Sequence, residues 1–166
     1  MKKLLIYGLI ATLSGLMFFS SCIEDTNYPV EPKIKFESFR KVNQDSTGII
    51  TLSFTDGDGD IGLSESDTLY PYDSTYFYNF FLYIFERKNG QYDSVQTSIP
   101  FHGRIPLLEN VEEGESIEGE IEMELDIFSM DVFIPGDTVV FDIFIVDRAL
   151  HHSNTVRTSP IILNSF

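Results

Sequence analysis

The sequence of this 166-residue chain predicts an all-β protein, an antiparallel β-sandwich of about seven strands. Apolar and polar residues alternate with the period of two that is typical of strands, and Gly, Pro, Asn and Asp separate the alternating segments. No window carries a sustained helical stripe. A small closed barrel needs a similar number of strands, so the pattern leaves that alternative open.

The first 21 residues have the pattern of a signal peptide. Lys2 and Lys3 precede an apolar run from Leu4 to Phe19, and small residues follow it directly before Cys22, the single cysteine of the chain. The run has roughly 16 residues, which is marginal for a hydrocarbon core about 30 Å thick. These residues therefore predict export of the chain rather than a membrane-spanning helix.

This start resembles that of bacterial lipoprotein precursors, in which the signal is cut directly before a cysteine that then carries the lipid. Ser21 before Cys22 is typical of the variant found in Bacteroidetes. The resemblance implies a signal peptide at 1–21 and a mature chain that begins at a lipidated, palmitate-bearing Cys22. A buried free thiol behind a simple secretory signal or membrane anchor is the alternative.

Residues 22–32 contain two prolines and several polar residues, which predicts an extended tether ahead of a sandwich domain at 33–166. Removing the signal takes away two of the 11 Lys and Arg and none of the 26 Asp and Glu, so the net charge changes from −15 to −17. Attachment to an anionic membrane must then come from the acyl chains. Glu24 and Asp25 resemble the signal that carries Bacteroidetes lipoproteins to the outer face of the outer membrane, with the periplasmic face as the alternative.

The same charge excludes nucleic-acid binding through a basic surface, because the protein repels phosphate backbones. The lone cysteine excludes an internal disulfide and a thiolate zinc site. An aromatic content of 14% supplies enough apolar surface for a packed core.

Seven segments carry the strand pattern: 34–39, 50–54, 76–88, 92–97, 117–127, 139–145 and 155–163. The first is slightly irregular. Asn89-Gly90 predicts a tight hairpin turn, because both residues tolerate positive φ. Residues 62–75 are the longest expected insertion between strands.

One motif carries chemistry, the aspartates Asp56, Asp58 and Asp60 directly after the second strand. Glycines separate them and allow the backbone to curl, so that hard oxygen ligands converge as calcium requires. A solvated acidic turn and a site for another divalent ion are the alternatives. The helix-loop-helix calcium template fits poorly, because Ile61 replaces its glycine, Asp67 at the twelfth position is shorter than Glu, and no helices flank the loop.

The stretch from Ser53 to Gly62 is similar to one near the start of many uncharacterised Bacteroidetes lipoproteins. The later stretch from Phe141 to Thr155 is similar to the closing strands of bacterial immunoglobulin-like and fibronectin-like domains, although Ala149 to His152 replaces the Ala-Gly-Asn often found there. The family implies an immunoglobulin-like sandwich in the cell envelope and no known activity. Asp147 completes the metal site if the last strands bring it near Asp56.

Three other groups of residues are weaker candidates for a functional site. Glu118, Glu120, Glu122, Glu124 and Asp126 form a row of carboxylates on one strand face, with neighbours about 6.6 to 6.8 Å apart, which is typical of a solvated outer face. His151 and His152 lie near Asp147 but bind one zinc together only from a loop. Six tyrosines could form a glycan-binding surface, because sugars stack on their rings; ordinary packing within the sandwich is the alternative. They are Tyr70, Tyr72, Tyr76, Tyr78, Tyr83 and Tyr92.

The sequence thus predicts a non-enzymatic, lipid-anchored binding or adhesion module of the outer membrane, displayed at the cell surface and stabilised by calcium. Its partner is an envelope protein or glycan, besides the membrane reached through the anchor. The alternative is a polysaccharide-processing hydrolase or a glycan-binding accessory lipoprotein.

Overall fold

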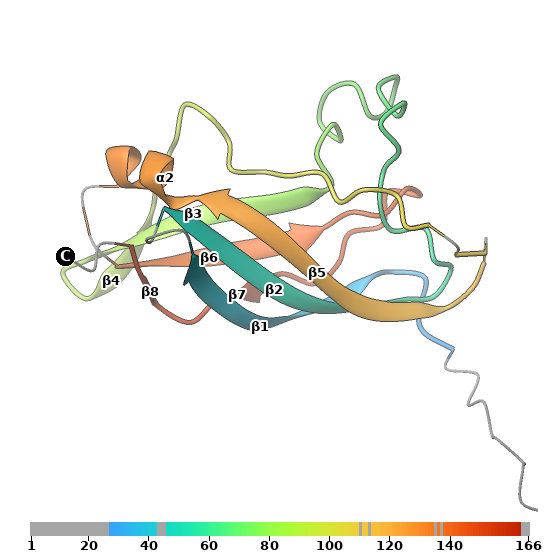
Figure 1. Ribbon diagram of the computed structural model, residues 1–166, viewed down its shortest axis with the longest axis horizontal. Helices are drawn as coiled ribbons and strands as arrows, with labels where there is room; N and C mark the ends of the chain where they lie inside the picture. Colours follow the sequence, from blue (N-terminus) through green and yellow to red (C-terminus); the bar gives the residue numbers. More distant parts are fainter. Residues whose placement is uncertain are drawn as a thin grey trace, which may run out of the picture.

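In the computed structural model, antiparallel strands form two sheets that pack against each other (Figure 1). The structure describes residues 27–42, 46–109, 111–112, 114–134, 136 and 138–163. The elements within this part of the chain are β1 (Lys33–Val42), β2 (Thr47–Asp56), β3 (Phe80–Lys88), β4 (Gln91–Ser94), β5 (Ile117–Asp126), α2 (Ile127–Phe133), β6 (Thr138–Ile145), β7 (Val156–Arg157) and β8 (Ile161–Ile162).

The strand order is that of an immunoglobulin-like sandwich. The first sheet has the order β1-β2-β5, and the second has the order β4-β3-β6-β7, with β8 also paired to β6. Every strand pair within the two sheets is antiparallel. The predicted all-β sandwich is therefore confirmed, and the closed barrel is not formed. The described residues form eight strands, because the expected last strand is split in two.

Alternate residues of each strand face the interior, as the sequence pattern predicts. The core joins the inner faces of both sheets and includes Ile50, Leu52 and Phe54 of β2, Phe80, Leu82 and Ile84 of β3, and Phe141, Ile143 and Ile145 of β6. The register of β1 against β2 shifts between Phe36 and Ser38. This β-bulge accounts for the irregular pattern of the first strand.

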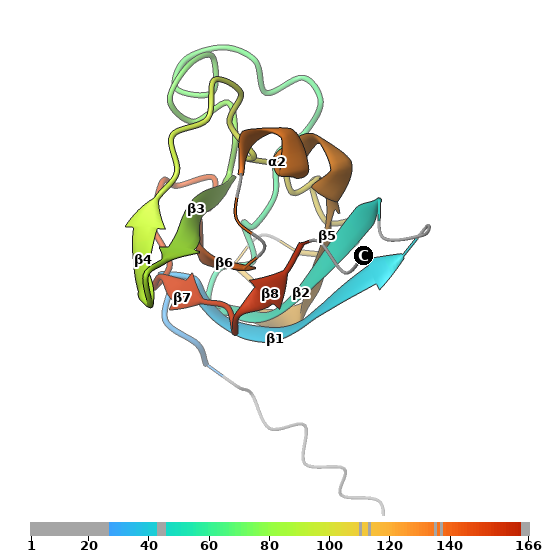
Figure 2. The same cartoon turned by 90° about the vertical axis from the view of Figure 1, so that its left-hand side faces the viewer.

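The expectation of no helix was wrong for α2, which follows β5 without a linker. Asp126 caps this helix, since its carboxylate accepts hydrogen bonds from the Ser129 amide at 3.0 Å and the Ser129 hydroxyl at 2.6 Å. Ile127 and Met130 are buried in the core, and Figure 2 shows the helix over the edge between β5 and β3. Seven residues are too few to show a helical stripe.

Two predicted strands have different bounds in the structure. The strand expected from Tyr76 begins only at Phe80, because the buried Asn79 side chain bonds to both backbone groups of Ile105. The strand expected over 155–163 is interrupted between β7 and β8, where Pro160 has no N–H to donate to the ladder. The turn at Asn89-Gly90 is confirmed, with φ of 51° and 85°.

The loop after β2, the turn after β6 and residues 27–32 lie together at one end of the sandwich (Figure 1). The predicted signal peptide at 1–21 and Cys22 lie outside the described residues. Among the described residues, no helix is long and apolar enough to cross a membrane.

Candidate metal centre

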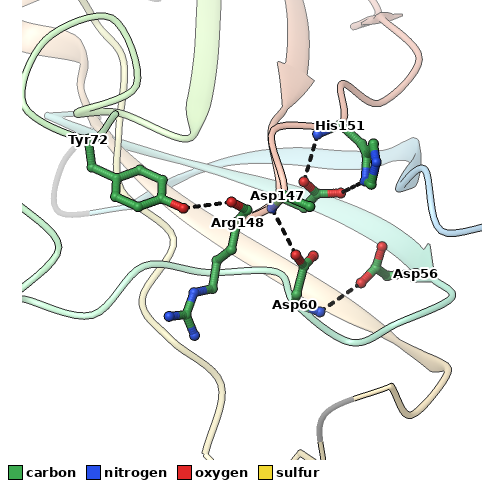
Figure 3. Close-up of polar contacts among 7 residues, drawn as sticks. Asp56, Asp60, Tyr72, Asp147, Arg148 and His151 are labelled. Carbon is green, nitrogen blue, oxygen red and sulfur yellow. Dashed lines mark hydrogen bonds and ion pairs between the residues drawn. The ribbon is translucent and has the colours of Figure 1, made fainter. Parts of the chain in front are cut away.

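The alternation of β2 brings Asp56 into the protein interior. Leu52 and Phe54 face the core, so the side chain two residues further on points to the same face, and Asp56 is fully buried (0% exposed). Its Oδ2 atom accepts a hydrogen bond from the Asp60 amide at 3.0 Å (Figure 3). This bond closes the loop and carries Asp58 and Asp60 back toward the end of the strand.

Two glycines allow the loop to pack closely. Gly59 has a φ of +69°, a conformation that costs an L-residue about 1 to 2 kcal/mol. A Cβ atom at Gly59 would lie 2.6 Å from the Glu115 carbonyl oxygen, and one at Gly57 would lie 2.3 Å from the Tyr28 carbonyl oxygen. The loop therefore packs closely against Tyr28 at Gly57 and against Glu115 at Gly59.

The three aspartates form a cluster that could hold a metal ion. One oxygen from each side chain lies within 4.8 Å of the other two. Two ligands of one calcium ion can be at most about 4.6 to 5.2 Å apart, which is twice the Ca–O distance, so the spacing fits a single ion.

A second observation points to a ligand. The Oδ1 atoms of Asp56, Asp58 and Asp60 are shielded from solvent, and none accepts a hydrogen bond from any residue that the structure describes. A buried carboxylate oxygen without a partner is costly, and nearly all buried polar atoms have one. The cluster could therefore hold a cation, and its hard, oxygen-only chemistry suits calcium or magnesium better than zinc.

The pKa values of the clustered aspartates show that their negative charges are poorly compensated by the protein. Burial raises the pKa of Asp56 to about 6, and the charges of Asp58 and Asp60 add to this shift. Burial also raises the pKa of Asp60, with further contributions from Asp147 and Asp58. Without a counter-ion, these carboxylates resist carrying their charges together.

The turn after β6 covers the cluster from the second sheet (Figure 3). The Ala149 amide donates to Asp60 Oδ2 at 2.9 Å, and the Arg148 amide donates to the Asp60 carbonyl at 3.2 Å. The Tyr72 hydroxyl donates to the Arg148 carbonyl at 2.6 Å, which ties the insertion to the same turn. These contacts fix Asp60 but leave its Oδ1 atom available.

Asp147 is buried beside the three aspartates, but its carboxylate is already occupied. Its Oδ1 atom accepts from the His151 amide at 2.7 Å, and its Oδ2 atom bonds to His151 Nδ1 at 2.9 Å. Burial raises the pKa of Asp147, and its carboxylate raises the pKa of His151. Asp147 as a fourth metal ligand stays a prediction. The sequence did not identify its pairing with His151, although a short Asp-to-His spacing in a loop is a signal for such a bond.

The other candidate ligands do not join the cluster. Asp67 accepts from the Ser64 amide at 2.8 Å within its own turn. His152 stacks on Phe144 with a centroid distance of 5.4 Å, so the two adjacent histidines point to different surroundings. A shared zinc site at His151 and His152 has no support from this geometry.

Three of the six tyrosines belong to one connected group of aromatic and imidazole rings. Tyr76 packs edge-on against His152, and Tyr78 and Tyr83 pack against His102, whose pKa is lowered by burial. Tyr83 also stacks on Phe144, so part of the ring surface is covered by other rings. Elsewhere, Tyr70 is 87% exposed at the insertion, and Tyr92 lies on β4.

The carboxylate row predicted on β5 lies on the exposed face of the first sheet. A groove of about 550 Å³ crosses this face, with opposite charges along its two sides and hydroxyls between them. Its polar side chains come from Lys33, Lys35, Ser53, Thr55, Glu118 and Glu120.

Fold and site together define a class: an immunoglobulin-like β-sandwich with a buried carboxylate cluster at one end that could hold a metal ion. No protein-family model matches the chain. No curated protein matches it either. A solved structure described as the X-ray structure of Northeast Structural Genomics Consortium target SoR45 is 13% identical, covering 82% of this chain and 86% of that chain, with a TM-score of 0.24.

Proposed function

We propose that this protein is a calcium-stabilised, non-enzymatic binding module held at the bacterial outer membrane by a lipid on Cys22. Two observations together carry the calcium site: one carboxylate oxygen from each of Asp56, Asp58 and Asp60 lies within 4.8 Å of the other two, and the Oδ1 atom of each is buried without a hydrogen-bond partner. Calcium is favoured over magnesium because it accepts irregular sets of six to eight oxygens, whereas magnesium prefers octahedral geometry and keeps several waters.

The role proposed for calcium is to hold loops rather than to catalyse. The cluster lies where the loop after β2 meets the turn after β6, so an ion there joins the two sheets at one end of the sandwich. In immunoglobulin-like folds the loops at the ends of the sheets often form binding surfaces. A fixed loop arrangement lowers the entropy cost of binding an envelope partner.

Thermal unfolding of the full chain in calcium and in chelator tests the cation site. At a hundredfold excess over the dissociation constant, calcium should stabilise the native state by about 2.7 kcal/mol. Asp58→Ala should abolish this response. Glu120→Ala removes the same charge from the exposed face of β5 and should keep it. An equal calcium response in wild type and Asp58→Ala would contradict the site.

The envelope location is proposed from the sequence of the first 25 residues. Cys22→Ala should abolish incorporation of labelled palmitate and release the protein from the membrane fraction. Surface display predicts that external protease digests the protein on intact cells. Continued labelling of Cys22→Ala would show that the lipid is carried at another residue and would contradict the proposed anchor.

A glycan-binding accessory role is the second candidate, and the groove on the first sheet favours it. Its hydroxyls and opposite charges suit the many donors and acceptors of a saccharide. Hydrolysis is less well supported, because Glu118 and Glu120 are both exposed, whereas a glycosidase acid needs surroundings that keep it protonated. Retardation in gels containing soluble polysaccharide, lost in Glu120→Ala, would support this role.

A further inference from the structure

We infer that a cation bound by Asp56, Asp58 and Asp60 fixes the segment around Tyr28 to the domain, so that occupancy of the site controls how rigidly the sandwich is joined to its N-terminal anchor. This inference rests on the proposed cation site and adds a mechanical role to it. It also names the part of the chain that the ion would control.

One hydroxyl connects this segment to the aspartate loop. The Tyr28 amide donates to Ser116 Oγ at 3.4 Å, and Ser116 Oγ donates to the Gly57 carbonyl at 3.0 Å. Gly57 lies between two of the three proposed ligands. A movement of the loop at Gly57 would therefore change the position of the Ser116 hydroxyl and, with it, the hydrogen bond to the Tyr28 amide.

The contact is also one of close packing. A Cβ atom at Gly57 would lie 2.3 Å from the Tyr28 carbonyl oxygen and 2.6 Å from the Pro29 carbonyl carbon. Only a glycine lets the two backbones approach this closely. The Tyr28 hydroxyl also donates to Glu118, which gives the segment a second attachment on β5.

The loop is held from its other side by the chain that precedes β5. The Gly114 amide donates to the Asp58 carbonyl at 3.0 Å. The loop thus contacts both residues 28–29 and residues 114–116. In the absence of an ion, repulsion among the three clustered carboxylates favours opening of the loop, which displaces Gly57 and removes the surface on which Tyr28 and Pro29 pack.

The consequence is orientation relative to the membrane. Tyr28 follows Cys22 by six residues, which can span at most roughly 22 Å. If Cys22 carries the lipid, the end of the sandwich with the metal site faces the membrane. A fixed segment then restricts the tilt of the domain, and a released one lets it swing.

The chain contains no Trp, so Asn27→Trp in the full chain gives a single fluorescent probe beside the contact. We expect calcium to raise the fluorescence anisotropy of this probe and to reduce its quenching by acrylamide at least about twofold relative to chelator. Asp58→Ala in the same background should remove both effects.

Ser116→Ala separates this coupling from metal binding. It should leave the calcium-induced rise in melting temperature in place while the anisotropy stays at its chelator value. Ser94→Ala on β4 is the matched control that should behave as wild type. Calcium that raises the melting temperature without changing the anisotropy of Asn27→Trp would overturn the coupling and leave the cation site standing. If calcium changes neither, both proposals fail.

Discussion

The aspartate loop after β2 and the outer face of β5 are both dense in carboxylates, but they differ in environment. In the loop, three side chains converge within 4.8 Å and each has one shielded oxygen without a partner. On β5, the glutamates are exposed, and one of them, Glu122, pairs with Arg40 of β1 at 3.2 Å. Water and mobile ions screen the second region but not the first.

The difference teaches that charge density alone does not identify a metal site. Both regions contribute to the net charge of −15. Only the loop combines convergence with burial, and burial makes the unpartnered oxygens costly unless a cation meets them. Substitutions that exchange properties between the regions test this distinction.

The largest expected effect concerns the pH dependence of Asp56→Asn. The native-state pKa of Asp56 is about 6 against an ordinary value of 3.8, so the native state keeps a proton that the unfolded chain releases. In chelator, this carboxyl therefore lowers the free energy of unfolding as pH rises from about 4 to about 6, by about 3 kcal/mol. Asp56→Asn should remove this loss and be more stable than wild type at pH 7 in chelator.

Calcium should reverse the order, because the charged carboxylate of aspartate attracts the ion more strongly than the neutral amide oxygen of asparagine does. Urea unfolding at pH 4 to 7, with calcium and with chelator, measures both signs. Glu124→Gln, a matched change on the exposed face, should keep the calcium response of wild type. If Asp56→Asn is the less stable protein in chelator at pH 7, the carboxylate has a partner other than a metal ion.

Two glycines, Gly59 in the aspartate loop and Gly119 on β5, provide the second test. Gly59→Ala forces a side chain into φ of +69° and against the Glu115 carbonyl, so it should destabilise the protein by about 2 kcal/mol. Gly119→Ala on β5 places a Cβ atom 3.2 Å from the Phe54 ring, a tight contact that a small shift of the ring relieves, and should change stability by less than about 1 kcal/mol. Thermal unfolding of both variants measures the difference, and equal costs would mean that the loop yields without strain.

Most of the fold could be predicted from the sequence, because strand alternation and turn residues are local signals. Phe80 and Asp126 show where such signals fail. The strand expected from Tyr76 starts late because of a contact between Asn79 and Ile105, which are 26 residues apart. The pattern on β5 runs into Ile127 without a break, and only the N-cap bonds of Asp126 show that a helix begins there.

The site was partly predictable for the same reason. The spacing of Asp56, Asp58 and Asp60 is local, and alternation along β2 predicts which aspartate is buried. The bond between Asp147 and His151 is local, but it depends on the turn between them, and the packing of Tyr28 on Gly57 depends on tertiary structure that no pattern in the sequence shows.

Substitution of Asp147 has the smallest expected effect on calcium binding, and it tests whether this residue is a direct metal ligand. Both of its carboxylate oxygens accept hydrogen bonds from His151, so a bound ion would gain its charge without a direct ligand. Asp147→Ala should therefore weaken calcium binding by about tenfold, which corresponds to about 1.4 kcal/mol, as measured by calorimetric titration. Glu124→Ala on the exposed face removes the same charge and should leave the affinity unchanged. A loss as complete as that of Asp58→Ala would instead make Asp147 a direct ligand, released by His151 when the ion binds.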